Sequence, residues 1–145
     1  MADAIHPTTG RLASRFYSSD LIREPAYQAY QILHIGFTVA PILAGLDKFA
    51  HVLVNWDQYL TPAVARLLPF SGHSFMLLVG VVEVVAGLIV AVRPRIGAYI
   101  VSAWLVAIII NLLLAGGFYD IALRDLGLAL GALALARLSQ NYDRA

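Results

Sequence analysis

Glu83 is the residue in this sequence most capable of chemistry, because it is an ionisable carboxyl group inside a long apolar run. The run, residues 75–92, contains no other charged residue, and Glu83 lies near its middle. Removing a carboxylate from water is costly unless a cation lies beside it. A charged residue at this position therefore indicates an ion pair or a site for a proton or a polar ligand.

Other polar residues fall near the ends of the neighbouring apolar runs and are expected to join Glu83. The predicted cluster comprises Asp47, Lys48, Glu83, Asn111, Arg124 and Asp125. Helical spacing puts Asp47 in line with Ala44, and it puts Arg124 in line with Gly127. Small residues mark the faces on which membrane helices pack, so these side chains are expected to point into the protein rather than toward lipid.

Two interpretations of this cluster remain open. In the first, it is a buried ion-pair network that fixes the register of the helices, with Lys48 or Arg124 as the cation beside Glu83. In the second, it is a ligand or proton site, with a quinone headgroup near Glu83 and Arg124 and with Trp104 lining the pocket. No cofactor motif is evident, so quinone or lipid is the only kind of bound cofactor that the sequence allows us to expect.

The histidines give weaker signals. His34 is the only histidine inside an apolar run, and a membrane haem needs axial ligands from facing helices, so we do not expect haem. His51 and His73 flank a long loop, but two histidines without a spaced carboxylate pair are too little to predict a metal site. The sequence has no cysteine, which excludes thiolate ligands and disulfide chemistry within it.

The composition indicates that the protein lies in a membrane. Hydrophobic residues make up 60% of the 145 residues and charged residues only 13%, with a mean hydropathy of +0.76. A soluble domain usually carries about 25% charged residues, so the excess apolar side chains must face lipid. The net charge of +1 comes without a basic cluster, which excludes a nucleic-acid-binding surface.

Four apolar runs have the length needed to cross about 30 Å of hydrocarbon. The predicted fold is an all-α bundle of four transmembrane helices, at residues 26–48, 75–92, 96–115 and 120–138, within a domain of residues 25–140. A polar tail, residues 1–24, precedes it. Small residues at helical spacing predict the contact faces; they are Gly36, Ala40 and Ala44, then Gly80 and Gly87, then Ala103 and Ala107, then Gly127 and Gly131.

The loop between the first two runs, residues 50–72, has too many apolar side chains for a solvated connection. Thr61 followed by Pro62 is typical of a helix start. We therefore expect a short helical segment lying on the membrane surface. Trp56 and Tyr59 are its candidate anchors for docking a partner, while Tyr27 and Tyr30 are expected to be anchors at the membrane interface.

The distribution of basic residues predicts the orientation. Seven of the ten Lys and Arg residues lie in the tail, in the turn between the second and third runs, or at the C-terminus. The positive-inside rule then places both termini in the cytoplasm and the loop of residues 50–72 outside. We expect a multi-pass protein of a bacterial-type inner (cytoplasmic) membrane.

Two short motifs resemble the DoxX-like family of small four-helix integral membrane proteins. Residues 45–49 read GLDKF at the end of the first run, and residues 80–88 read GVVEVVAGL, followed by Arg93. The likeness covers about residues 27–138. It implies a four-helix fold and a link to quinone-coupled or oxidative-stress-related membrane complexes, since the original members resemble a subunit of a thiosulfate-oxidising, quinone-reducing enzyme.

Two functions are therefore expected from the sequence. The first is a non-catalytic accessory subunit of a larger respiratory or photosynthetic membrane complex, with lipid and other membrane subunits as partners. The alternative is a quinone-linked oxidoreductase subunit that uses Glu83 and Arg124. A proton path or small transporter would need more than one ionisable group at mid-membrane, and Glu83 is the only one.

Overall fold

Four long helices make up most of the computed structural model, which describes residues 21–143. In chain order the elements are α2 (Pro25–Ala50), the 3₁₀ helix η1 (Trp56–Tyr59), α3 (Pro62–Ala65), α4 (Gly72–Val92), α5 (Pro94–Ala115) and α6 (Tyr119–Tyr142). No strand occurs among residues 21–143, so the predicted all-α class is confirmed. Most of the predicted N-terminal tail lies outside the described residues.

Three of these helices, α2, α4 and α5, are long and apolar enough to cross a membrane. The described part of the chain is thus that of a multi-pass membrane protein whose outer surface contacts lipid. The fourth long helix, α6, has a lower hydropathy because Asp120, Arg124 and Asp125 lie in its first two turns and Arg137 lies near its end.

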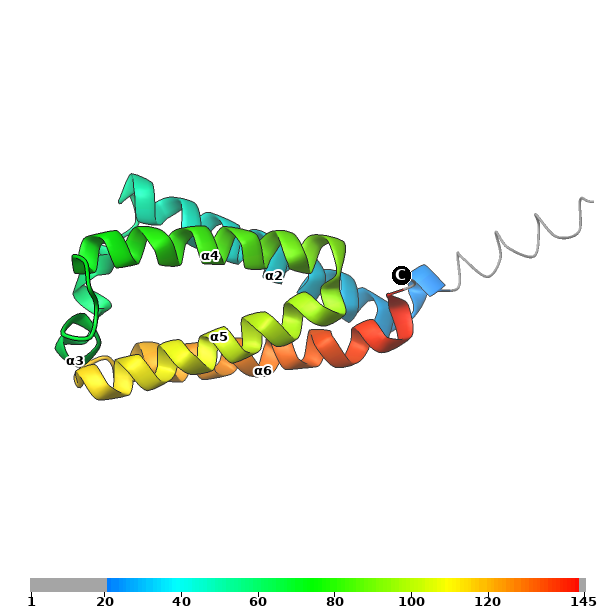
Figure 1. Cartoon of the computed structure of the whole chain (residues 1–145). Helices are drawn as coiled ribbons and strands as arrows, with labels where there is room; N and C mark the ends of the chain where they lie inside the picture. The colour runs from blue at the N-terminus through cyan, green and yellow to red at the C-terminus, as the bar shows by residue number, and fades with distance from the viewer. Residues whose placement is uncertain (1–20, 144–145) are drawn as a thin grey trace, which may run out of the picture.

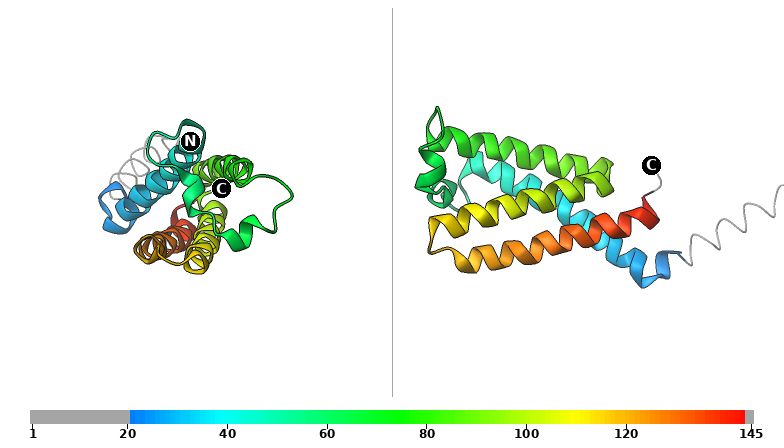
Figure 2. Two further views of the ribbon diagram at one scale, coloured as in Figure 1. Left: turned by 90° about the vertical axis from the view of Figure 1, so that its left-hand side faces the viewer. Right: turned by 60° about the horizontal axis from the view of Figure 1, so that its bottom comes forward.

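The long helices form two closely packed pairs, α2 with α4 and α5 with α6. Figures 1 and 2 show that the pairs approach each other at the α4–α5 turn and diverge toward α3. The start of α2, the end of α6 and the α4–α5 turn lie at one end of the molecule (Figure 1). Residues 51–71, called here the connecting segment, lie at the other end with the α5–α6 turn.

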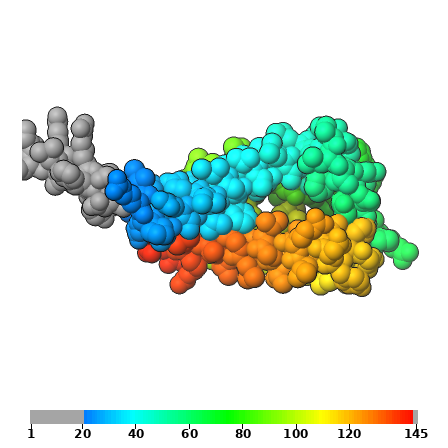
Figure 3. Space-filling model, turned by 180° about the vertical axis from the view of Figure 1, so that it is seen from behind, coloured from blue at the N-terminus to red at the C-terminus, as the bar shows by residue number. Residues whose placement is uncertain are grey.

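The two ends of the bundle differ in how they are packed. At the end with the α4–α5 turn, a buried core joins all four helices. From α2 it includes Tyr30 and Phe37, and its fully buried members from the other helices are Val90, Ala98, Ala132, Leu135 and Ala136. Viewed from behind, α2 and α6 are in contact at this end, and a hollow separates them farther along (Figure 3). Apolar packing therefore dominates in one half of the bundle, and the other half depends more on polar bonds.

Tyr30 differs from its expected role as an anchor at the membrane interface. Its side chain is only 6% exposed and belongs to the core. Its ring lies 5.6 Å from that of Tyr142, and Tyr27 packs edge-on against Tyr142 at 5.4 Å. The Tyr142 hydroxyl also donates a hydrogen bond to Glu24 Oε1 at 3.0 Å. These aromatics join the start of α2 to the end of α6.

Glycines set the close approach of α2 to α4. A Cβ atom at Gly45 would lie 2.5 Å from the Gly80 carbonyl oxygen, and one at Gly80 would lie 2.7 Å from the Gly45 carbonyl oxygen. A Cβ atom at Gly87 would likewise lie 2.8 Å from the Thr38 carbonyl oxygen. Backbones this close leave no room for a side chain, as is common where membrane helices pack.

Five predicted contact positions are exposed on the bundle surface instead; they are Gly36, Ala40, Ala103, Ala107 and Gly127. A Cβ added at Gly36 or at Gly127 would meet no atom within 4 Å, and both residues are exposed on the bundle surface. Small-residue spacing is ambiguous in a helix rich in Ala and Gly, because more than one face then carries small side chains. Packing on α2 uses the face of Gly45, and Gly36 lies on another.

Replacing Gly45 by Ala should therefore destabilise the bundle by about 1–3 kcal/mol, the usual cost of overpacking. The added methyl group would force α2 and α4 apart at the level of Gly80. The midpoint of thermal unfolding in detergent should fall relative to the wild type. Gly36→Ala is the matched control and should be neutral or stabilising, because Ala has the higher helix propensity. Equal losses in both variants would contradict this account of the interface.

Candidate functional site

Glu83 forms a buried ion pair with Lys48 that links α4 to α2. Lys48 Nζ donates a hydrogen bond to Glu83 Oε2 at 2.6 Å, and the two side chains are 3% and 11% exposed. The close approach of Gly45 and Gly80 brings the two helices near enough for this contact. Of the two cations predicted as partners of Glu83, the structure selects Lys48.

A second group, the Trp56 indole, also stabilises the Lys48 ammonium. Its Nζ lies 3.8 Å from the centroid of the Trp56 ring, over the face of the indole. The negative face of an aromatic ring attracts a cation, and more strongly where water is excluded. Lys48 is therefore held between a carboxylate on α4 and an indole of the connecting segment.

Asp47 fixes the start of the connecting segment. Its Oδ1 accepts hydrogen bonds from the backbone N–H groups of Val52 and Leu53 at 2.9 and 3.0 Å. Its Oδ2 accepts one from Trp56 Nε1 at 2.7 Å. The carboxylate is thus satisfied by the chain that follows it and does not contact Glu83. Asp47 and Lys48 are adjacent in sequence, and both hold Trp56.

Asn111 fixes the middle of the connecting segment to α5. Its Nδ2 donates a hydrogen bond to the Tyr59 carbonyl at 2.8 Å, and its Oδ1 accepts one from the Thr61 N–H at 3.3 Å. The Tyr59 ring also packs edge-on against Phe118, at 5.2 Å, beside the α5–α6 turn. The connecting segment therefore joins the two helix pairs at the end where they diverge.

The residues predicted to come from α6 behave differently. Asp125 is half-buried and near enough to Glu83 for their charges to interact. Arg124 lies outside the cluster: its side chain is 70% exposed and contacts Asp120 on its own helix at 3.4 Å. The expected headgroup pocket needs Arg124 beside Glu83, whereas the Arg124 side chain lies on the exposed surface. Arg124 is directed away because the packing of α6 against α5 uses Ala122 and Ala129 instead.

The predicted docking residues Trp56 and Tyr59 are both half-buried and engaged within the chain. Their rings pack edge to face at 6.1 Å. The apolar side chains that the connecting segment exposes are others, namely Val52, Leu53, Leu67 and Phe70. The sequence alone does not show which apolar side chains of the segment are buried and which are exposed.

Trp104, on α5, is the predicted pocket residue that lies beside Glu83 of α4. Its Nε1 is shielded from solvent and close enough to the Glu83 carboxylate to interact with it, although no partner lies at full hydrogen-bond distance. It lines a shallow apolar groove of about 340 Å³ between α4 and α5; the other lining residues are Val82, Ala86, Ile100, Ala103 and Ala107. The groove could take an apolar ligand.

His34 takes part in helix packing. Its Nε2 lies 3.0 Å from the Val90 carbonyl oxygen on α4, and its ring lies 5.5 Å from that of Tyr30. The contact with Val90 joins α2 to α4 in the apolar half of the bundle, and the contact with Tyr30 lies within α2.

Comparison with known proteins adds no family to this description. No protein-family model matches the chain, and no curated protein or solved structure matches it either.

Proposed function

We propose that this protein is a DoxX-like, non-catalytic accessory subunit of a larger energy-transducing membrane complex, either respiratory or photosynthetic. One observation carries the proposal. Three polar side chains of the bundle, Asp47, Lys48 and Asn111, contact the connecting segment, and that segment exposes apolar side chains. These polar contacts therefore hold the exposed apolar side chains of the connecting segment in fixed positions.

The hydrogen bonds of the polar residues support this reading. Asp47 bonds only to residues of the connecting segment, and Asn111 bonds to its backbone at two points. Lys48 is enclosed by Glu83 and Trp56. These polar contacts stabilise one conformation of the connecting segment. A rigid surface favours binding because it loses little entropy when a partner docks.

The exposed surface of the segment supports a protein partner. Leu67 is 84% exposed, Val52 81% and Leu53 73%, although the segment belongs to none of the membrane-spanning helices. Apolar side chains gathered on a surface outside the hydrocarbon mark sites for protein or membrane contact. We assign this surface to another subunit, which would cover the side chains that the bundle leaves open.

The second candidate function is a quinone-linked oxidoreductase subunit. The observation that favours it is the groove between α4 and α5, where apolar side chains beside Trp104 could receive an isoprenoid tail. Glu83 would contribute less than expected to such a site, since Lys48 already engages it. The accessory function is therefore preferred.

The proposal includes four membrane spans with both termini in the cytoplasm of a bacterial-type cell. The helix α6 would cross the membrane as the fourth span, supported by α5, and Ser102 Oγ bonds to the Ala129 carbonyl between them at 3.0 Å. Its charged residues lie in its first two turns and near its end, where long side chains can reach the headgroups.

Cysteine labelling tests this topology, since the natural sequence has no cysteine. A cysteine at Gln58, in the connecting segment, should react with a membrane-impermeant maleimide added to intact cells. Cysteines at Ser14 and Gln140 should react only after the cells are opened. If the cysteine at position 140 reacts from outside and the one at position 58 does not, the orientation is the reverse of the one proposed. If both react, α6 does not cross the membrane.

Co-purification tests the docking function. The tagged chain, extracted from its native membranes in mild detergent, should bring with it subunits that carry redox cofactors, visible by their absorption. Val52→Ser combined with Leu67→Ser should reduce this recovery about tenfold, corresponding to about 1.4 kcal/mol of binding free energy. The bundle should stay folded, because both side chains are exposed.

The control is Gln58→Ser, which alters an exposed polar side chain of the same segment. It should leave recovery of the partner subunits unchanged. Isolation of the wild-type chain alone, carrying extractable quinone, would contradict the accessory function and support the quinone-linked one.

A further inference from the structure

We propose that His51, Asp57 and His73 form a binding site for a divalent transition-metal ion, with zinc as its reference metal. One ligand atom from each residue lies within 4.8 Å of the other two. The site is separate from the Lys48–Glu83 pair and lies where α2 ends and α4 begins. The sequence did not predict it, because the third ligand, Asp57, comes from η1, and the position of η1 depends on how the connecting segment folds.

Each of the three residues is held by a feature that ends or begins a helix. His51 terminates α2 in the left-handed conformation, with φ of 52° and ψ of 38°, and its N–H donates to the Asp47 carbonyl at 2.7 Å. Asp57 is the second residue of η1, and the Asn55 side chain accepts a hydrogen bond from its N–H at 3.1 Å. The local backbone conformation therefore fixes the positions from which the His51 and Asp57 side chains extend.

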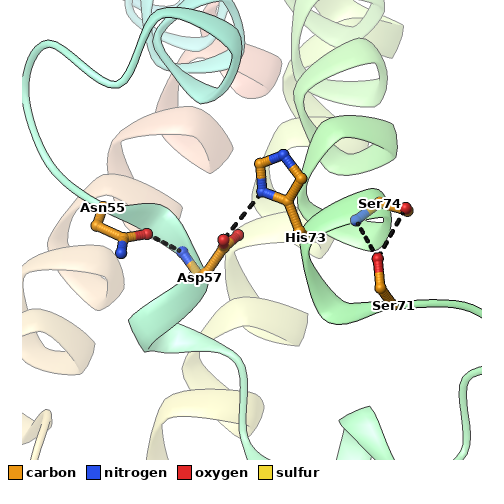
Figure 4. Close-up of polar contacts among 5 residues, drawn as sticks. All are labelled: Asn55, Asp57, Ser71, His73 and Ser74. Atoms are coloured by element: carbon orange, nitrogen blue, oxygen red, sulfur yellow. Dashed lines mark hydrogen bonds and ion pairs between the residues drawn. The ribbon is translucent and has the colours of Figure 1, made fainter.

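His73 is positioned in the same way at the start of α4. Ser71 caps this helix, accepting a hydrogen bond from the Ser74 N–H at 3.2 Å. Figure 4 shows the two capped turns facing each other, with the His73 ring directed at the Asp57 carboxylate. His51, which the figure does not draw, stacks on the His73 ring at 5.6 Å between centroids.

One of the distances already matches that between two ligands of a metal ion. His73 Nδ1 lies 3.0 Å from Asp57 Oδ2. Two ligands of a tetrahedral zinc ion, each about 2.0–2.1 Å from the metal, lie about 3.3 Å apart. Asp57 and His73 thus already have nearly the separation of zinc ligands. His51 and His73 are exposed, so their side chains can rotate to complete the set.

An unsatisfied atom also points to a ligand here. Asp57 Oδ1 is shielded from solvent and has no hydrogen-bond partner. A buried carboxylate oxygen without a partner is costly, and a cation bound by the same carboxylate would remove that cost. The Asp57–His73 contact alone leaves this oxygen unpaired.

The ligand set selects the class of metal. Two imidazoles and one carboxylate are typical of zinc and its neighbours in the first transition series, whereas calcium and magnesium prefer oxygen ligands alone. Three protein ligands leave a fourth position for water or for a group from a partner. A bound ion would link the end of α2, η1 and the start of α4, and so hold the connecting segment in one conformation.

Zinc titration of the full-length protein, purified without a polyhistidine tag, tests the site. The wild type should bind one zinc ion, and its thermal unfolding midpoint should rise with zinc and not with magnesium. Asp57→Asn, His73→Asn and His51→Asn should each weaken zinc affinity by about tenfold or more, given that even groups supporting a ligand typically matter that much. Asn at position 51 tolerates the left-handed backbone, so this variant should still fold.

His6→Asn is the matched control, since it removes a histidine far along the chain from the three ligands. It should leave the zinc affinity and the zinc-dependent rise in unfolding temperature unchanged. With cobalt as a substitute, the wild type should show the intense visible absorption of a tetrahedral ion, and the three ligand variants should not. Absence of stoichiometric zinc binding would overturn the proposal, as would zinc binding that all three ligand variants retain.

Discussion

The ion pair between Lys48 and Glu83 is the interaction on which the half of the bundle next to the connecting segment depends. Both side chains are buried, and each would be strongly unfavourable there without the other. Their contact requires α2 and α4 to approach as closely as Gly45 and Gly80 allow. Glycine packing and charge pairing therefore specify the same register of the two helices, and neither is satisfied in another.

The effect of the pair extends beyond α2 and α4. Lys48 also lies against Trp56, whose N–H bonds to Asp47, so the end of α2 and the connecting segment are fixed together. Asn111 then attaches that segment to α5. The apolar core holds the helix pairs at the other end of the bundle. Where the pairs diverge, the polar bonds supply the connection that apolar packing does not.

The helical architecture could be predicted from the sequence because long apolar runs bounded by Pro, Gly and charged residues leave few alternatives. Each of the four long helices contains one of the four predicted runs. The importance of Glu83 was also predictable, since a carboxyl group isolated in such a run needs a partner. Its partner remained ambiguous between Lys48 and Arg124, and the structure shows Lys48.

Helix rotation and loop conformation could not be predicted, for a physical reason. A helix facing lipid is apolar on all sides, so hydrophobic periodicity does not identify its inner face. Arg124 was placed inward from its spacing to Gly127, yet both are exposed. The meeting of Asp57 with His73 depends on caps formed by Asn55 and Ser71, which act only once the loop is folded.

A double-mutant cycle on the ion pair tests the central claim most directly. Glu83→Gln and Lys48→Gln should each lower the free energy of unfolding in detergent by about 3–5 kcal/mol, because each leaves a buried charge unpaired. The double variant should recover most of that loss, whereas Glu83→Gln with Arg124→Gln should recover none. A stable Glu83→Gln protein, with no coupling to Lys48 in the cycle, would contradict a structural role for the pair.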